Sequence, residues 1–440
     1  MKNIKKGLSL LLVLGFTVGI IIGCSNSTNK AASSTNSTNG IGTAPITLNF
    51  WYWEDVQGQY KSTFDSLWNA YAKKNNMSNV TINFESISNS VFHDKLIPAI
   101  AAGTAPDLFK MSPSWVPELV GLNSLLPLDN YVKSWDIVKN GDIPANVLDM
   151  CYAGQKKLYT MPHTNVVLYL YCRKDLFAAD GVKIPTTMDE FYEAAKELTR
   201  DTNGDGKIDQ YGFAMRGASG GQSMWSALVF NSAKNIDYMD SKGNVAFNNA
   251  TVIAANQKYI DLYKDGYTPP TAPTDGQQQI TQEFESGVAA MLIHHVGSSA
   301  AIVNAIGADK VEVVPLPEGA GGRYVVMDPS NIAISSQSKN SAAAVAALKF
   351  FCSTDAQDAL CKTIGQVPWL KTVSSDSFFQ SNPFQKISIE YLSQAKMVSI
   401  VPTMANFTST VFPQTLQRAL MGEITSKEMI QTLADALKGN

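Results

Sequence analysis

Residues 80–111 read VTINFESISNSVFHDKLIPAIAAGTAPDLFKM and contain, in order, a strand, a helix and a second strand. Apolar and polar residues alternate over 80–84, which predicts a half-buried strand. Residues 91–102 have a helical pattern that ends at Gly103, and the apolar run 108–111 predicts a buried strand. Two strands joined by one helix predict a right-handed crossover on a mostly parallel sheet.

The same alternation extends on both sides of this stretch. Further strands are predicted at 46–50, 166–172, 288–293 and 332–335, and a further helix at 60–71. The capping boxes Thr187–Glu190 and Thr425–Glu428 predict the starts of two more helices, the second of which ends near Lys438. The chain is therefore expected to be an α/β protein.

Length and composition favour a globular protein of two lobes. Residues 45–440 exceed the roughly 250–300 residues at which a single core stops growing. Apolar residues make up 45% of the chain, charged residues 17%, and the net charge is −3. No cluster of lysine or arginine follows the first few residues, so a nucleic-acid partner is not expected.

The N-terminus has the features of an export signal. A lysine-rich start precedes an uncharged apolar run over 7–22, which is shorter than the ~20 residues of a spanning helix. A small residue before Cys24 resembles a bacterial lipobox. Residues 1–23 are thus expected to be a lipoprotein signal peptide and Cys24 to be lipidated, with a plain signal anchor as the alternative. The Ser/Thr/Asn-rich residues 24–44 are expected to form a flexible tether.

A series of short motifs recurs in a fixed order through the mature chain. They are AAGTAPD (101–107), LLPLD (125–129), KLYTMP (157–162), YCRKDLF (171–177), PTTMDEF (185–191), YGF (211–213) and FESGVAAM (284–291). In order and spacing they resemble the extracellular solute-binding proteins of ABC importers, the group that includes maltose-binding protein. The resemblance implies a binding component, not an enzyme, with the two-lobed periplasmic-binding-protein type II fold.

The resemblance also implies how the chain is divided. Three crossovers between the lobes are expected, near Pro162, Val314 and Gly365. The N-lobe would comprise residues 45–162 and 316–366, and the C-lobe residues 163–315 and 367–440. A monomer is expected on the extracellular face of the membrane of a bacterium, of the Gram-positive type. Its partners would be a carbohydrate solute, the ABC permease subunits and, through the lipid, the membrane.

Candidate ligand residues follow from the chemistry of sugars, which present apolar CH faces and rims of hydroxyls. Aromatic rings cover such faces, and carboxylates, amides, hydroxyls and arginines bind the rims. Because ligands of α/β sheets sit beyond the carboxyl ends of strands, residues near such ends are candidates. The resemblance adds residues at the implied crossovers and in loops that the family brings to the cleft. The candidates are Trp51, Trp53, Glu54, Ser112, Trp115, His163, Asn165, Trp225, His294, Arg323, Trp369 and Phe407. For the tryptophans and Phe407 the alternative is a place in the core.

The turn after His294 departs from the family. Similar proteins often carry a sugar-stacking tryptophan there, whereas this chain has Val296 and Gly297. Histidine could replace stacking with hydrogen bonds to hydroxyls. Adjacent strand residues point to opposite faces, so His294 and His295 are not expected to share a metal ion.

One short motif resembles a calcium loop. Asp201, Asn203, Asp205 and Asp209 stand at positions 1, 3, 5 and 9 of an EF-hand-like pattern. Position 12 is Gly212 in place of the usual bidentate glutamate. A structural calcium ion or a simple Asx-rich turn are the two alternatives, and no other cofactor is expected.

Cysteines and carboxylates leave further alternatives open. Cys151, Cys172, Cys352 and Cys361 form no CxxC pair. A Cys352–Cys361 disulfide is the first pairing to test, with four buried thiols as the alternative.

A glycosidase would need separated paired carboxylates, and Glu54 and Asp55 are adjacent. A non-sugar solute such as a polyamine is the remaining alternative, and the sequence does not identify the sugar.

Overall fold

The computed structural model describes residues 40–53, 58–234, 237–240, 242–327, 329–392, 395–397 and 400–438. The predicted signal peptide, the lipidation site Cys24 and residues 24–39 of the predicted tether lie outside these residues, as does Glu54. None of the described helices is long and apolar enough to span a bilayer.

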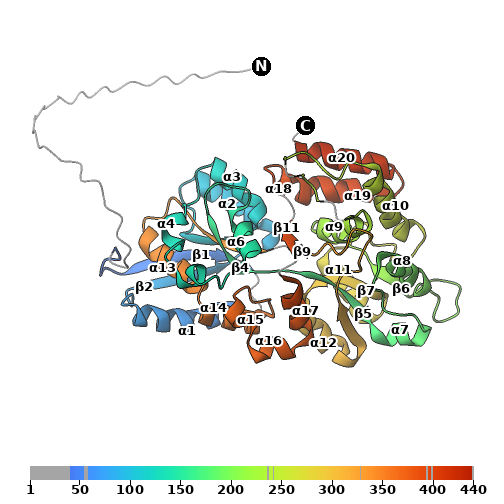
Figure 1. The fold of residues 1–440 in the computed structure, drawn as a ribbon, viewed down its shortest axis with the longest axis horizontal. Coiled ribbons are helices and arrows are strands. Elements are labelled where there is room, and N and C mark those ends of the chain that lie inside the picture. Colours follow the sequence, from blue (N-terminus) through green and yellow to red (C-terminus); the bar gives the residue numbers. More distant parts are fainter. Residues whose placement is uncertain are drawn as a thin grey trace, which may run out of the picture. The chain divides into compact units, whose positions relative to one another are not determined.

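The first lobe is built on a five-stranded sheet with the order β2-β1-β3-β10-β4 (Figure 1). Its strands are β2 (Val80–Ser86), β1 (Ile46–Tyr52), β3 (Leu108–Met111), β10 (Ser330–Ile334) and β4 (Thr160–Thr164). Strands β1, β2 and β3 are parallel, as the strand–helix–strand pattern predicts. Strand β10, however, runs antiparallel to both of its neighbours, because it enters this sheet on return from the other lobe.

The second lobe is built on a four-stranded sheet with the order β6-β7-β5-β8. Its strands are β6 (Tyr211–Ala214), β7 (Ala289–His295), β5 (Leu168–Arg173) and β8 (Val311–Val314). Strand β5 is antiparallel to both β7 and β8, and only β6 and β7 are parallel. In each sheet one inserted strand, β10 or β5, runs against the others, and the remaining strands share one direction. The prediction of mostly parallel sheets is therefore confirmed, and the inserted antiparallel strand is what it lacked. A two-stranded parallel ribbon pairs β9 (Val326–Met327) with β11 (Lys396–Met397).

Helices flank both sheets (Figure 1). Those of the first lobe are α1 (Gln59–Lys74), α2 (Asn89–Ala101), α3 (Val116–Gly121), α4 (Asp129–Val132), α5 (Asp136–Lys139), α6 (Ala145–Tyr152), α13 (Ser341–Phe351), α14 (Thr354–Ile364) and α15 (Lys371–Ser374). Around the second are α7 (Lys174–Asp180), α8 (Met188–Glu197), α9 (Gly221–Ser232), α10 (Ala250–Lys264), α11 (Gln277–Ser286), α12 (Ser299–Ile306), α16 (Ser377–Ser381), α17 (Pro383–Leu392), α18 (Met404–Asn406), α19 (Phe412–Leu420) and α20 (Ser426–Lys438). Single turns are η1 (Pro113–Trp115), η2 (Val296–Ser298), η3 (Ala308–Lys310) and the π-helical η4 (Phe407–Val411).

Both predicted capping boxes form. The Thr187 hydroxyl accepts from the backbone N–H of Glu190, and the Glu190 carboxylate accepts from the N–H of Thr187. Thr425 and Glu428 exchange the same pair of bonds at the start of α20. Each box satisfies backbone donors that a helix otherwise leaves free, which is why a local four-residue pattern sets these helix starts.

The chain crosses between the lobes three times. Strand β4 of the first sheet extends to Thr164. Glu318 pairs with Thr187 of the second lobe, and β10 of the first sheet begins at Ser330. The backbone N–H of Lys371 donates to the Asp142 carbonyl of the first lobe. The lobe boundaries stay a prediction.

The strand β1 separates two apolar clusters through the alternation of its side chains. Leu48, Phe50 and Tyr52 pack into the main core, where the Tyr52 ring stacks on Tyr60 at 4.3 Å between centroids. Trp51 and Trp53 belong to the cluster on the opposite face of the sheet. The run Trp-Tyr-Trp thus divides between core and opposite face, as the period of a strand requires.

All four described cysteines are buried free thiols, so the Cys352–Cys361 disulfide is absent. Burial raises the pKa of each thiol, which keeps them protonated and unreactive.

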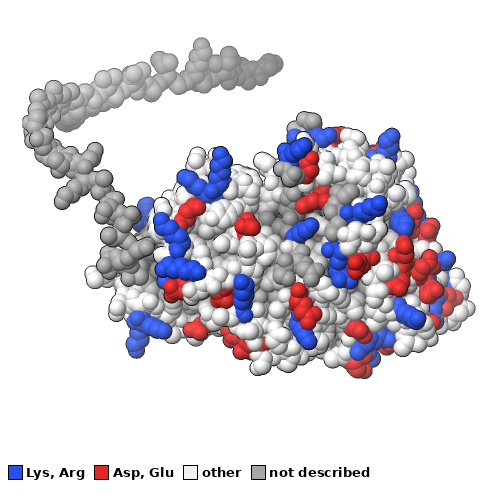
Figure 2. Space-filling view, viewed as in Figure 1, with Lys and Arg blue, Asp and Glu red and all other residues white. Residues whose placement is uncertain are grey.

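On the surface, lysine and arginine side chains are interspersed with acidic ones over the face that Figure 2 shows.

Candidate functional site

The first-lobe side of the candidate site is a group of aromatic rings beyond β1 and β3. The rings of Trp53 and Trp115 lie 5.9 Å apart, and both contact Phe92 of α2, at 4.9 and 6.0 Å. Trp51 meets the same Phe92 edge-on at 6.3 Å. Trp51 and Trp115 are half-buried, whereas Trp53 is 7% exposed. The structure therefore brings three of the predicted tryptophans together, and we call Trp53, Phe92 and Trp115 the aromatic wall.

Ser112 shapes the turn that carries Trp115. It caps η1 by accepting from the N–H of Ser114 at 3.3 Å, and the two hydroxyls share a 2.8 Å hydrogen bond. The turn η1 also lies against α18 from the C-terminal part of the chain. Ser112 thus has a local structural role beside the aromatic wall.

A buried cation that was not predicted lies under the wall. Lys110 of β3 is fully buried, and its ammonium group lies 4.8 Å from the centre of the Trp53 ring. A lysine in an otherwise apolar strand was the sequence signal for it, because lysine is almost never fully buried without a partner. Its charge reaches His163, whose pKa is lowered well below the usual value by burial and by Lys110.

His163 is packed in the interior near the first crossing. It is fully buried, and its Nε2 shares a hydrogen bond of 2.7 Å with the Tyr60 hydroxyl. Its carbonyl accepts from the Gln357 amide and the Trp369 indole, both at 3.2 Å. Trp369 is itself fully buried. Both residues therefore join the crossing segments together beneath the surface.

Asn165 lies at the point where the first and third crossings meet. It pairs with Val367 in an isolated bridge and is fully buried. Among the described residues, neither the oxygen nor the nitrogen of its side-chain amide has a hydrogen-bond partner. The neighbouring Gln366, 4% exposed, likewise has an unpartnered amide oxygen within the described chain. Two buried amides with unused hydrogen-bonding capacity thus adjoin the crossings.

The second-lobe side is formed by the end of β7. His294 is 4% exposed, and its Nδ1 shares a 2.8 Å hydrogen bond with the Ser298 hydroxyl. Burial, His295 and Arg216 together lower its pKa well below the usual value, so its imidazole is neutral at pH 7. A Cβ at Gly297 would lie 2.7 Å from the Gln366 amide nitrogen and 2.9 Å from Nδ1 of His295. Glycine at this turn therefore allows the third crossing to approach β7 closely.

Three further predicted residues have partners of their own. Trp225 is fully buried among aromatic rings of the second lobe, and its indole N–H donates to Asn256 at 2.7 Å. Phe407 is fully buried in the same core. Arg323 donates to the Leu316 carbonyl and lies over the Tyr391 ring at 5.3 Å.

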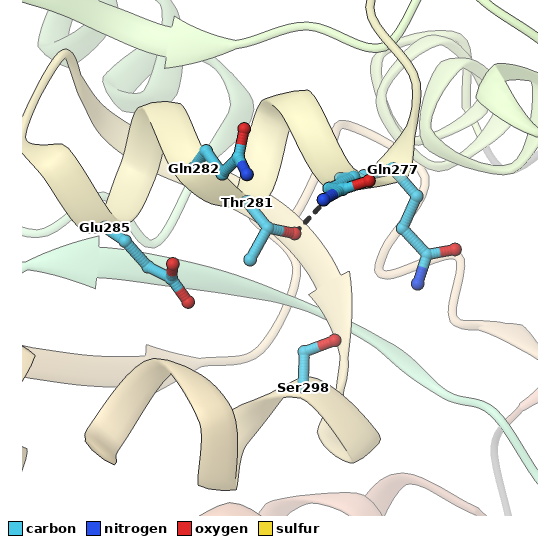
Figure 3. Close-up of a pocket in the computed structure, with 6 residues that line it drawn as sticks. Gln277, Thr281, Gln282, Glu285 and Ser298 are labelled. Carbon is cyan, nitrogen blue, oxygen red and sulfur yellow. Dashed lines mark hydrogen bonds between the residues drawn. The ribbon is translucent and has the colours of Figure 1, made fainter. Parts of the chain in front are cut away.

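A polar cavity of about 430 Å³ opens beside the second-lobe half of the junction. Figure 3 shows Gln277, Thr281, Gln282 and Glu285 along α11, with Ser298 across from them. Ser298 is the same residue that bonds His294, so the cavity is one hydrogen bond away from the junction. Its Gln-rich lining is open to solvent, and this cavity was not predicted from the sequence.

The predicted calcium loop is an exposed series of turns. The Asp201 carboxylate accepts from the backbone N–H groups of Gly204 and Gly206, both at 2.6 Å, and these bonds lower its pKa. Asp209 accepts from the N–H and hydroxyl of Thr202. Within the described residues no group of three or more His, Cys, Asp or Glu side chains is arranged to hold a metal ion. A calcium site here stays a prediction.

Comparison with known proteins places this geometry in a family. The sequence pattern described as "Bacterial extracellular solute-binding protein" matches residues 57–358. A binding protein of Brucella abortus is 24% identical over 326 residues, which are 73% of this chain and 77% of that protein.

Two solved structures share the fold. The GacH receptor of Streptomyces glaucescens, solved unliganded and with acarbose, has a TM-score of 0.76 at 20% identity and covers 90% of this chain and 99% of its own. An ABC transporter solute-binding protein of Thermotoga lettingae, bound with α-D-tagatose, has a TM-score of 0.77 at 21% identity with the same coverage. At such identities the likeness establishes the two-lobed fold.

Proposed function

Because this chain belongs to the bacterial extracellular solute-binding proteins, we propose that it serves an ABC importer and that its solute is a carbohydrate held at the junction of the two lobes. Proteins of this family bind a substrate and do not transform it, so the chain is not an enzyme. The sugars bound by GacH and by the Thermotoga lettingae protein support the same class of solute here.

The observation that carries the proposal is the buried, unpartnered amide of Asn165. Leaving such a group without a hydrogen bond costs about 1–3 kcal/mol. A sugar hydroxyl both donates and accepts, so it can satisfy an amide nitrogen and an amide oxygen alike. Gln366 offers a second acceptor beside it. A solute rich in hydroxyls therefore matches the unused hydrogen-bonding capacity of the buried Asn165 and Gln366 amides.

The aromatic wall supports the same class of solute from the first lobe. Trp115 is half-buried and presents part of its ring, backed by Trp53 and Phe92, near the strand ends where ligands of such folds lie. The CH face of a sugar ring would pack on these rings, while its hydroxyls reach the amides. An apolar surface with a few placed polar groups is the usual composition of a small-molecule site.

A polyamine is the rival solute. The buried amides of Asn165 and Gln366 are neutral and suit the hydroxyls of a sugar, whereas a polyamine would need carboxylates to pair its several positive charges.

We infer that the protein delivers its solute to a permease from the outer face of the cell membrane. The apolar run 7–22 and Cys24 support lipid anchoring, with residues 24–44 as the tether. Cys24→Ser should release the protein into the medium of the producing bacterium. If the variant remains in the membrane pellet after a carbonate wash as fully as the wild type does, the lipid anchor is refuted.

The solute is tested with a panel of glucose, mannitol, maltose, maltotriose and raffinose, with spermidine as the rival. We expect at least one sugar to raise Tm and to bind measurably by calorimetry. Asn165→Leu should weaken that binding tenfold or more, which corresponds to about 1.4 kcal/mol. Asn248→Ala, at an exposed asparagine of the second lobe, is the matched control and should bind normally. Binding of spermidine but of no sugar would overturn the proposal.

A further inference from the structure

We propose that His93 and Glu118 form a positioning pair, which holds the Trp115 ring in the orientation from which it meets the solute. The inference rests on the proposed carbohydrate site and adds two residues to it. Neither His93 nor Glu118 is placed against the Asn165 and Gln366 amides. They act through the aromatic wall, so they are positioning residues and not direct ligands of the solute.

The Trp115 ring is held by contacts on several sides. Phe92 stacks on it with an interplanar angle of 27°, and Trp53 lies at a tilt of 55°. The closest ring is that of His93, which meets Trp115 edge-on at 4.9 Å between centroids. Trp115 ends η1 and is the N-cap residue of α3, which begins at Val116. The helical backbone sets where the side chain starts, and the neighbouring side chains decide where the ring lies.

The His93 ring is fixed in turn by Glu118. Its Nε2 and Glu118 Oε2 are 2.8 Å apart, which joins α2 to the first turn of α3. A ring held at one nitrogen has its plane set, in the way that an outer carboxylate orients a metal-binding histidine. The edge that His93 turns toward Trp115 is therefore determined by the bond to Glu118.

The partial exposure of this pair indicates that it orients the Trp115 ring more than it stabilises the fold. The side chains of His93 and Glu118 are 28% and 34% exposed. Partly exposed polar pairs of this kind contribute little to folding, because water competes for their hydrogen bonds and because holding two side chains costs entropy. A pair of this kind leaves the fold almost unchanged when it is broken. When the pair is broken, however, the Trp115 ring gains conformational freedom at the surface where a sugar would stack.

The first readout needs no solute. The protein is labelled with 5-fluorotryptophan, and the fluorine resonance of Trp115 is assigned by its loss in Trp115→Phe. We expect His93→Ala and Glu118→Gln each to shift or broaden this resonance. His93→Phe keeps a ring edge against Trp115 but loses the bond to Glu118, and should have an intermediate effect. Lys61→Ala breaks the exposed Lys61–Asp65 pair on α1 of the same lobe and should leave the resonance unchanged.

The second readout is affinity for the panel sugar that raises Tm most. His93→Ala and Glu118→Gln should each weaken it about three- to tenfold, with Tm nearly unchanged, and Lys61→Ala should not. An unmoved Trp115 resonance in both variants overturns the proposal, and so does a moved resonance with unchanged affinity. If the wild type binds no sugar of the panel, the proposed function fails, and the resonance alone decides whether the pair orients Trp115.

Discussion

Tyr60 and His163 are joined by a hydrogen bond of 2.7 Å between the phenolic hydroxyl and Nε2, although they lie 103 residues apart on α1 and β4. Both side chains are fully buried. The pKa of His163 is held well below its usual value by burial and by the charge of Lys110, so the imidazole is neutral. This bond therefore ties the helix that follows β1 to the strand that leads into the first crossing.

Tyr60→Phe should destabilise the protein. The change removes the hydroxyl and leaves a buried Nε2 without this partner, which costs about 1–3 kcal/mol. Urea unfolding followed by circular dichroism measures the loss. Tyr131→Phe, at a tyrosine that is 38% exposed, is the control and should unfold as the wild type does. Equal stability of Tyr60→Phe and wild type would mean that the hydroxyl does not support the crossing.

Stability should reach its maximum near pH 6.5. The folded-state pKa values of His163 and His294 are lowered, so stability is lost as pH falls below the usual value of 6.5, where the unfolded chain binds more protons. The pKa of Glu283 is raised to about 8 by burial and by Asp275, so its contribution is present below about 4.5 and is lost as pH rises toward 8. Melting temperatures between pH 5 and 9 give the profile.

Glu283→Gln separates the two contributions to this profile. The amide cannot ionise, so the loss of Tm between pH 6.5 and 8 should become smaller than in the wild type. On the acid side, between about pH 4.5 and 6.5, the rise of Tm with pH should become steeper, because the ionisation of Glu283 no longer opposes the contribution of the histidines. A matched control is Glu285→Gln on the same helix, for which the alkaline fall should remain. An alkaline slope that is the same in Glu283→Gln and wild type would contradict the assignment to Glu283.

Features that depend on neighbours along the chain could be predicted from the sequence. Thr187 with Glu190, and Thr425 with Glu428, form their capping boxes because every partner lies within four residues. The alternation of β1 likewise predicts that Tyr52 faces away from Trp51 and Trp53.

Features that depend on distant segments could not be predicted. The antiparallel direction of β10 is set by its return from the second lobe, and nothing within residues 330–334 encodes it. Trp225 and Trp115 look alike as tryptophans in loop-rich segments, yet Asn256 and a ring of aromatics bury the first. His93 and Glu118 lie 25 residues apart in the sequence, and the fold brings them together beside Trp115.

The loop at 201–209 should keep its form without calcium. The Asp201 carboxylate already accepts from the backbone N–H groups of Asn203, Gly204 and Gly206, which stabilises the turn without a metal ion. EGTA should leave Tm unchanged within about 1 °C, whereas Asp201→Ala should lower it. Asp189→Ala, at an exposed aspartate of α8, is the control for loss of charge. A fall in Tm with EGTA that calcium reverses would contradict this and support a bound ion.

The tryptophans should divide into two classes when each is changed to alanine. Trp115→Ala should weaken binding of the panel sugar at least thirtyfold, roughly 2 kcal/mol, with Tm nearly unchanged, because a half-buried ring at a binding surface contributes to affinity. Trp225→Ala should instead cost about 3–5 kcal/mol of stability, because that ring is fully buried and its loss leaves a cavity and an unpaired Asn256 oxygen. Calorimetry at a temperature where both variants are folded separates the two effects. If Trp225→Ala loses affinity while it keeps its stability, or if Trp115→Ala unfolds without a change in affinity, the solute lies deeper in the second lobe than the aromatic wall.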